Sequence, residues 1–388
     1  MTRPFLPTDA AEATLVGRVL DPSVGGARIV TVSGDDFVDI TDLGPTVSDL
    51  FERDGVAALV RAAADEPGRH RFSIAPVLAA STPDPDPSSV RMLAPIDLQV
   101  IKAAGVTFVD SMIERVIEER AQGDSAQAAA TRDALAEAIG ATISSIKPGS
   151  EQAEKAKRVL QEQGLWSQYL EVGIGPDPEI FTKAPVLSAV GWGQQIGIRE
   201  DSSWNNPEPE LVMVVRSDGT AVGATLGNDV NLRDIEGRSA LLLGEAKDNN
   251  ASCSIGGLIR LFDDGFTMDD VRRFEITLRV EGLDGFVLDG TSSMSRISRD
   301  PLELVGHARA PHHQYPDGFV LFTGTLFAPT QDRHAPGAGF THDLGDVVTI
   351  ATDRLGALTN TVTYSHRAPE WTVGIRAFFA NLRERDYV

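Results

Sequence analysis

The sequence predicts a strand-rich α+β fold, in which a small N-terminal α+β domain (residues 1–88) precedes a larger, mostly β domain with peripheral helices (residues 89–388). Three observations predict this organisation. Short β-rich runs and one helical patch fill residues 13–80, a run with three prolines follows at 81–89, and β-rich runs dominate beyond residue 168. The length of 388 residues exceeds one average domain, which agrees with a division in two.

The N-terminal part alternates predicted strands with one helical patch. We expect strands at 14–19, 29–32 and 37–40, separated by glycine-containing breaks. Residues 47–64 have helical spacing, with one apolar side formed by Leu50, Val56, Leu59 and Val60. Residues 81–89 form the clearest linker, because each proline restricts itself and the residue before it. We therefore place the domain boundary there.

The helical stretches after the linker are expected to be peripheral. A strand at 91–96 precedes a helix whose apolar side contains Phe108, Met112, Ile113, Val116 and Ile117. Charged residues are expected to cover its other face, namely Glu114, Arg115, Glu118, Glu119 and Arg120. Two further helical stretches, 125–139 and 151–165, are rich in Ala, Glu, Gln and Lys. Together the three helices indicate a lid, an insertion or a subunit interface.

The rest of the chain is predicted to be mostly β. We expect strands at 169–174, 195–199, 211–216, 220–226, 273–281, 286–289, 319–323 and 347–351. Residues 211–215 are apolar at every position, so both faces of that strand should be covered. Asp300 followed by Pro301 predicts the beginning of a short helix, with a capping acid and a proline at the first helical position.

A hairpin around Asp218-Gly219 organises the candidate site. Asp-Gly between two β-rich runs predicts a two-residue type I′ turn, in which Ser217 faces Thr220 and the residue numbers of each cross-strand pair add to 437. Cross-strand partners share a face of the sheet, as do residues two apart on one strand. The register therefore places three carboxylates together, those of Glu208, Glu210 and Asp229.

This cluster predicts a metal site. Like charges a few Å apart raise each other's pKa, and a hard divalent cation removes that conflict. An all-oxygen ligand set suits Mg²⁺, Mn²⁺ or Ca²⁺ better than zinc. The alternative interpretation is a solvated acidic end of the hairpin, which is common in a chain this acidic.

The composition excludes several classes of partner. The chain has 35 Lys and Arg against 56 Asp and Glu, a formal charge of −21, which disfavours nucleic acid and anionic membranes. Its single cysteine, Cys253, excludes an internal disulfide framework and suits a reducing compartment. The N-terminus lacks the pattern of a secretory signal, and no apolar run approaches membrane-spanning length. We therefore expect a cytoplasmic protein.

Four further residues are candidates for chemistry. Glu179 and Lys183 flank an apolar couple, and a carboxylate near a cation can serve as a general base, although a surface salt bridge is the plainer interpretation. Lys247 lies in a polar loop and can stabilise negative charge beside a metal, although most loop lysines do not. Thr325 follows Thr323-Gly324 at a predicted strand end, where hydroxyls can bind a carboxylate; a plain strand end is the alternative. The seven histidines show no helical pair at zinc spacing.

The order of these motifs resembles the catalytic domain of the fumarylacetoacetate hydrolase superfamily, from about Leu93 to the C-terminus. Within it the chain resembles the 2-keto-3-deoxy-pentonate dehydratases, and this similarity extends into the N-terminal domain. The matching motifs are Phe5-Leu6-Pro7, 13–18, 164–171, 178–183, 204–210, 227–239, 247–253, 313–318, 323–325 and 355–362.

The resemblance implies a mixed β-sandwich or roll that binds Mg²⁺, with Mn²⁺ as a possible substitute. It assigns metal binding to Glu208, Glu210 and Asp229, and catalytic or substrate-contacting roles to Glu179, Lys247, Thr325 and Lys183. The implied substrate is a small 2-keto sugar acid of pentose breakdown, dehydrated to 2,5-dioxopentanoate. Relatives of this kind imply a homodimer or homotetramer.

One departure from the superfamily narrows the reaction. Its C–C hydrolases carry a His-x-x-Glu pair on a lid; here the histidine position falls on Ser111, and Glu114 matches the acidic one. The missing histidine argues against hydrolysis of an acylpyruvate and for elimination. The alternatives are a C–C hydrolase, a decarboxylase, a dehydratase of another 2-keto-3-deoxy sugar acid, or a non-catalytic metal-dependent binder of keto acids.

Overall fold

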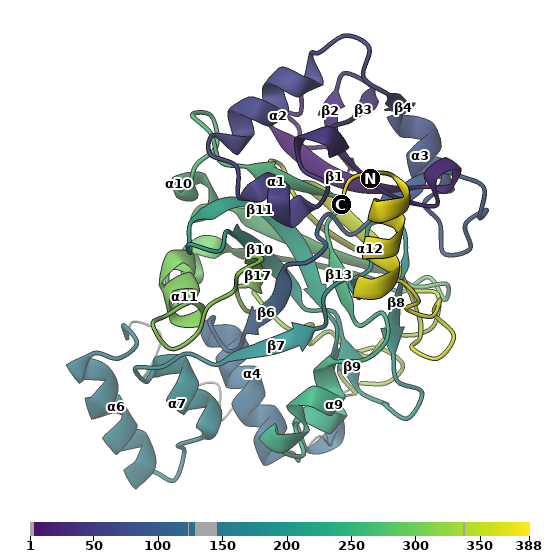
Figure 1. Cartoon of the computed structure of the whole chain (residues 1–388). Helices are drawn as coiled ribbons and strands as arrows, with labels where there is room; N and C mark the ends of the chain where they lie inside the picture. Colours follow the sequence, from purple (N-terminus) through teal and green to yellow (C-terminus); the bar gives the residue numbers. More distant parts are fainter. Residues whose placement is uncertain (1–3, 123, 129–145, 337) are drawn as a thin grey trace.

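A large mixed sheet forms the centre of the molecule (Figure 1). The computed structural model describes residues 4–122, 124–128, 146–336 and 338–388. Within these residues the sheet has twelve strands. Ten follow one hydrogen-bonded path, in the order β4 (Arg71–Ser73), β3 (Asp36–Asp39), β2 (Gly26–Ser33), β1 (Leu15–Asp21), β14 (Leu258–Leu261), β11 (Ala221–Asp229), β10 (Pro209–Val215), β17 (Phe319–Phe322), β6 (Val100–Ala104) and β7 (Ile180–Ala184). β13 (Cys253–Ile255) and β5 (Arg91–Leu93) pair with β11 and β1.

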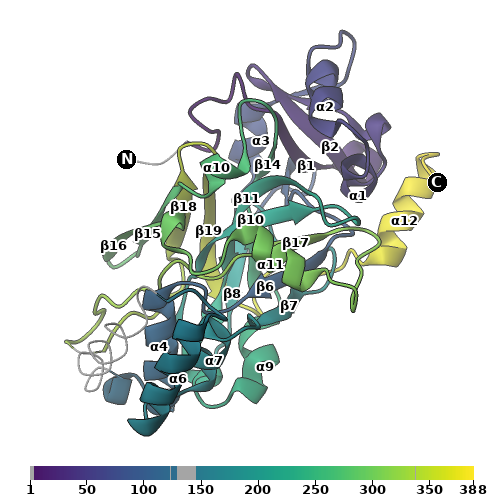
Figure 2. The ribbon, with the colours of Figure 1, turned by 90° about the vertical axis from the view of Figure 1, so that its left-hand side faces the viewer.

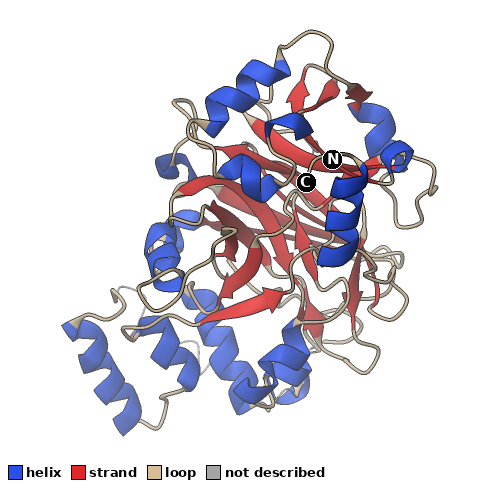
Figure 3. Cartoon of the chain, in the orientation of Figure 1, coloured by secondary structure: helices blue, strands red, loops and turns tan. Residues whose placement is uncertain are grey.

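A second sheet packs against the large one. Its five strands in the described part of the chain are β16 (Val287–Ser293), β15 (Glu275–Glu281), β18 (Val347–Thr352), β19 (Gly356–Tyr364) and β8 (Gln195–Ile198). Leu211 and Met213 of β10 belong to the same buried apolar cluster as Leu278 and Ile350 of the second sheet. The fold is therefore strand-rich and mixed, as predicted, with helices around the sheets (Figure 3).

Strand β10 is covered on both faces, as predicted. Its odd-numbered side chains face the second sheet, whereas Val212 and Val214 pack in a different cluster with two helices, α1 (Val47–Phe51) and α2 (Val56–Ala64). All seven residues of the strand are buried. The face of Val212 and Val214 is also the face of Glu210, because side chains alternate along a strand.

The helical patch predicted at 47–64 is two helices rather than one. Gly55, at the start of α2, has φ +65°, in the left-handed region where glycine carries no steric penalty. Leu59 was expected on the apolar side but is 36% exposed. Val56 and Val60 are buried as predicted, and Ala63 and Ala64 rather than Leu59 complete the buried side of α2.

The large sheet contains strands from both sides of the predicted linker and domain boundary. Residues 81–89 contain no helix or strand, as predicted. Strands β1 to β4 nevertheless belong to the large sheet, since β1 pairs with β14 and β5. The division at residue 88 stays a prediction.

The helices after the linker differ from expectation. α4 (Val109–Arg120) and α6 (Glu151–Glu162) lie where helices were predicted, at the lower end of the molecule in Figures 1 and 2. The predicted strand at 169–174 is wrong, because α7 (Gln168–Ile174) is a helix whose first turn is capped by the Ser167 side chain. Packing of Tyr169, Leu170, Gly173 and Ile174 outweighs the β preference of this segment. Most of the helix predicted at 125–139 lies outside the described residues.

The remaining elements are short connectors and one terminal helix. α11 (Pro301–Ala308) begins as predicted, with Asp300 accepting a hydrogen bond from the Leu302 amide. No helix in the described residues is long and apolar enough to cross a membrane. The other elements are η1 (Pro22–Val24), η2 (Thr41–Leu43), α3 (Ile74–Ala80), β9 (Asn205–Asn206), β12 (Asn231–Leu232), α8 (Arg233–Glu236), η3 (Ala240–Leu242), α9 (Leu243–Lys247), α10 (Met268–Val271), η4 (Met294–Arg296) and α12 (Ile375–Glu384).

Candidate metal centre

The β10–β11 hairpin has the predicted register but not the predicted turn. From Val214↔Gly223 to Pro209↔Asn228 the paired residue numbers add to 437. The loop, however, is longer than two residues, because the Arg216 amide donates to the Thr220 carbonyl at 2.9 Å. Asp218 is not among the residues with positive φ, so the type I′ prediction is wrong. A β-bulge at Val214/Val215 restores the expected register.

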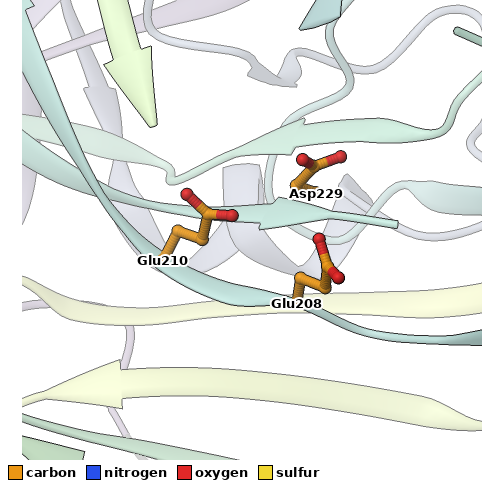
Figure 4. A group of neighbouring side chains, drawn as sticks. All are labelled: Glu208, Glu210 and Asp229. Carbon is orange, nitrogen blue, oxygen red and sulfur yellow. The ribbon is translucent and has the colours of Figure 1, made fainter. Parts of the chain in front are cut away.

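The three predicted carboxylates converge, as Figure 4 shows. Glu208 precedes β10, Glu210 lies within it, and Asp229 ends β11. One carboxylate oxygen from each lies within 4.8 Å of the others. Each side chain is 2% exposed or less, so the alternative of a solvated hairpin end is wrong.

The electrostatics of this cluster are unfavourable without a cation. Burial, with Asp229 and Glu208 nearby, raises the pKa of Glu210 well above the usual carboxyl range, although the Gly324 amide donates to its Oε2 at 2.7 Å. Burial also opposes ionisation of Asp229, but two lysines outweigh it and lower the pKa of that carboxyl. Without a cation, Asp229 is therefore readily ionised, whereas Glu210, whose oxygens lie close by, resists ionisation.

The two predicted lysines are both buried beside Asp229. Nζ of Lys247, at the end of α9, lies 2.5 Å from Oε2 of Glu208 and 3.2 Å from Oδ2 of Asp229. Nζ of Lys183, in β7, lies 2.9 Å from Oδ1 of Asp229 and also contacts the Lys247 carbonyl and the Ser252 hydroxyl. Burial opposes the charge on Lys247, but Asp229 and Glu208 raise the pKa of this ammonium, so it stays a cation. Both lysines therefore form ion pairs within the buried carboxylate cluster.

Glu179 and Thr325 lie in the same neighbourhood. Glu179 immediately precedes β7 and is half-buried. Burial raises the pKa of Glu179, and the nearby charges of Arg115 and Lys247 oppose that rise. Thr325 is 5% exposed and follows Gly324, whose amide binds Glu210; its hydroxyl donates to the Phe327 carbonyl at 3.3 Å. The structure thus places all seven predicted residues around one buried region.

A group of buried charged residues on α4 and α8 was not predicted from the sequence. Arg115 contacts Oε1 of Glu208 through Nη2, and its Nη1 lies 2.7 Å from Glu118 and 2.9 Å from Glu236. Arg233 binds the other oxygen of Glu118 at 2.6 Å. The expectation that Arg115 and Glu118 lie on the exposed face of α4 is wrong, because both residues are buried. Neighbouring charges three apart on a helix look like a surface ion pair, and no local signal in the sequence distinguishes the two cases.

Ser111 and Glu114, the two residues that the resemblance matches to the hydrolases' His-x-x-Glu pair, both contact other protein groups. The Ser111 hydroxyl donates to the Phe108 carbonyl at 3.0 Å. Oε2 of Glu114 lies 3.0 Å from Nη2 of Arg233, which itself stacks on the Trp204 ring at 4.4 Å. At the two positions that the resemblance matches to the hydrolases' pair, α4 thus carries a hydroxyl bonded to its own backbone and an ion pair.

The carboxylate cluster fits a hard divalent cation. The ligand set is three oxygens from a rigid hairpin, and Oδ1 of Asp229, although close to Lys183, accepts no hydrogen bond of acceptable geometry within the described residues. This oxygen can therefore accept a further contact from a metal ion, although the Lys183 ammonium already offsets part of its charge. Glu210 gains from a cation, because the cation offsets the repulsion that raises its pKa. The geometry therefore supports the ligand assignment made from the hairpin register.

Comparisons with known proteins agree with the fold. The family model described as fumarylacetoacetate (FAA) hydrolase C-terminal matches residues 155–363. A probable 2-keto-3-deoxyxylonate dehydratase of Haloferax volcanii is 35% identical over 214 residues, 55% of this chain and 68% of that protein. A 2-dehydro-3-deoxy-D-arabinonate dehydratase of Saccharolobus solfataricus is 31% identical over 188 residues, 48% of this chain and 58% of that protein.

Solved structures share the fold over nearly the whole chain. A 2-keto-3-deoxy-D-arabinonate dehydratase in its apo form has a TM-score of 0.59 at 21% identity, covering 90% of this chain and 99% of that one. The same enzyme complexed with magnesium and 2,5-dioxopentanoate has a TM-score of 0.58, with the same identity and coverage. Because the family model covers more than half of the sequence, this chain belongs to the fumarylacetoacetate hydrolase family.

Proposed function

We propose that this enzyme is a Mg²⁺-dependent dehydratase that converts a 2-keto-3-deoxy-pentonate to 2,5-dioxopentanoate. The observation that carries the proposal is the buried triad of Glu208, Glu210 and Asp229 with the Lys247 ammonium against it and Glu179 nearby. Two relatives above 30% identity are named as dehydratases of such acids, which supports the substrate class. The solved complex of a structural neighbour with magnesium supports the choice of metal.

The triad would hold the cation, and each neighbouring residue would have a distinct role. A cation held there would polarise the C2 ketone and acidify the C3 protons. Glu179, with its raised pKa, is a suitable base for a C3 proton. Lys247 stays protonated and stabilises the negative charge that develops on the substrate. Lys183 holds Asp229 in place, and Thr325 contacts the substrate.

The reaction balances with one water as the second product. Glu179 removes a C3 proton, the C4 hydroxyl leaves as water with a proton supplied by Lys247 or a bound water, and a C3–C4 double bond forms. Loss of a C5 proton and return of a proton to C3 give an enol, which becomes the C5 aldehyde. No oxidant or reductant is consumed.

The decisive test is a turnover assay with both C4 isomers. Purified protein and Mg²⁺ are incubated with the D- and L-forms of 2-keto-3-deoxy-pentonate, and 2,5-dioxopentanoate is followed by coupled oxidation. We expect chelator-sensitive product from one isomer and none from Glu208→Ala or Asp229→Ala. Full turnover of either variant in chelator would refute the proposal. Pyruvate release from an acylpyruvate, with both pentonates inert, would move the assignment to the hydrolase branch.

The proposal also includes the location and the assembly of the enzyme. A cytoplasmic enzyme of pentose breakdown would meet these substrates, and a homodimer or homotetramer is expected by resemblance to relatives. Light scattering on the purified protein measures the assembly directly.

A further inference from the structure

Arg115 links the lid helix α4 to the metal centre. Its guanidinium contacts three carboxylates that come from three segments, those of Glu208, Glu118 and Glu236. Arg115 is 7% exposed and the three acids 4% or less. A buried guanidinium without a carboxylate partner is strongly unfavourable, so the ion pairs of Arg115 with Glu208 and Glu236 help to hold α4 against the metal centre.

Cation binding competes with Arg115 for Glu208. Both oxygens of Glu208 are already engaged, Oε1 by Arg115 and Oε2 by Lys247 at 2.5 Å. Lys247 also has Asp229 at 3.2 Å and therefore keeps a carboxylate if it releases Glu208. When Glu208 turns an oxygen to a cation, the N–H groups of Arg115 need another acceptor.

Of the other two acids, Glu236 has the larger unused hydrogen-bonding capacity near Arg115 among the described residues. Glu118 uses one oxygen for Arg115 and the other for Nε of Arg233 at 2.6 Å. Oε2 of Glu236 lies 2.9 Å from Nη1 of Arg115, yet it accepts no hydrogen bond of acceptable geometry in the described part of the chain. Glu236 can therefore take another N–H after a small rotation of the guanidinium.

We propose that Glu236 is a positioning residue, which takes over Arg115 when Glu208 turns to a divalent cation and so keeps α4 docked over the loaded site. The inference rests on the metal site of the proposed function. It assigns no contact with substrate to Glu236. It does predict that Glu236 and Arg115 act on metal affinity as a coupled pair.

The test is a double-mutant cycle on Mg²⁺ affinity, measured by isothermal titration calorimetry on the intact protein. Glu236→Gln should weaken binding tenfold or more, within the range for residues that orient metal ligands. In an Arg115→Met background the same change should cost less than about twofold, because no guanidinium competes for Glu208. Glu245→Gln, which also removes one negative charge but at an exposed site, should leave affinity unchanged. An equal loss in both backgrounds would overturn the inference.

Hydrogen exchange of residues 109–120 provides a second test that does not depend on Arg115→Met folding. In the unmodified protein, Mg²⁺ should leave the protection of α4 unchanged or increase it, whereas in Glu236→Gln it should decrease it. Decreased protection in the unmodified protein would mean that α4 undocks and would refute the partner exchange. Mg²⁺ binding without turnover would instead refute the dehydratase assignment and leave this inference standing.

Discussion

The carboxylate of Glu179 lies directly against the Cα atom of Gly105. A methyl group at position 105 would stand 1.9 Å from Oε2 of Glu179 and 2.8 Å from its Cδ. The backbone ties the same residues together, because the Gly105 amide donates to the Glu179 carbonyl at 3.2 Å. Gly105, at the end of β6, thus sets where the proposed base can sit.

Gly105→Ala is therefore expected to displace Glu179 and slow the reaction. A displacement of about 1 Å can cost about a hundredfold in rate, so we expect kcat to fall about tenfold to a hundredfold. Mg²⁺ affinity should stay within about twofold, because the proposed metal ligands lie on the β10–β11 hairpin, away from β6. The matched control is Gly244→Ala, where the added methyl group meets no atom within 4 Å. Unchanged kcat, or an equal loss of Mg²⁺ affinity, would contradict this role of Gly105.

The pH dependence of kcat should show an acid limb set by Glu179. The base works only when ionised, so activity falls as pH drops through its pKa, which burial raises above the usual glutamate value of about 4.3. Protonation of metal ligands can also give an acid limb, but that limb shifts to lower pH as Mg²⁺ is increased. A kcat profile at several saturating Mg²⁺ concentrations separates the two. A limb at the ordinary glutamate pKa would count against Glu179.

Mg²⁺ should stabilise the fold through Glu210. At a Mg²⁺ concentration of a hundred times Kd the expected gain is about 2.7 kcal/mol, which raises Tm by several degrees. Glu210→Gln should abolish this rise, because a neutral amide replaces the anionic carboxylate. The metal-free variant should be at least as stable as the metal-free parent protein, since the repulsion from Asp229 and Glu208 is relieved. Differential scanning calorimetry with and without chelator measures both effects; a Tm rise retained by the variant would exclude Glu210 as a ligand.

Cys253 should be an unreactive thiol whose burial makes stability fall at high pH. Burial raises its pKa to about 12, against about 8.5 in an unfolded chain. The thiol's contribution is complete below pH 8.5 and is lost as pH rises toward 12, since only the unfolded state ionises in that window. Between pH 8.5 and 10 the parent protein should lose about 2 kcal/mol relative to Cys253→Ala. Urea unfolding at both pH values measures this difference, and rapid alkylation of the native protein at pH 8 would argue against it.

The β10–β11 hairpin shows what local sequence pattern does predict. Strand periodicity and an Asp-Gly turn placed Glu208, Glu210 and Asp229 on one face, and the structure agrees. The turn itself came out differently, as a three-residue loop with Gly219 at φ +92°, and Ser217 in that loop forms hydrogen bonds to Glu52, more than 160 residues away in the chain. A bulge then compensates, so the buried end of the hairpin keeps its register while the exposed end does not.

Helix α4 shows what local sequence pattern does not predict. Helical spacing identified the apolar side of α4 correctly, with Met112, Val116 and Ile117 fully buried. It also placed Arg115 and Glu118 in solvent, where a charged residue belongs by default. Their partners Glu208 and Arg233 lie 93 and 115 residues further along the chain, so no window of the sequence contains the contact that makes their burial favourable.

The sequence by itself therefore determined the strand-rich fold, the family and the three carboxylates, because each depends on periodicity, turn chemistry or motif order within short segments. Only the tertiary structure decided which charges surround those carboxylates. Lys183, Lys247 and Arg115 reach the cluster from three separate elements. Burial makes these contacts energetically important, because a charge removed from water needs an oppositely charged partner that is close in space, whatever their separation in the sequence.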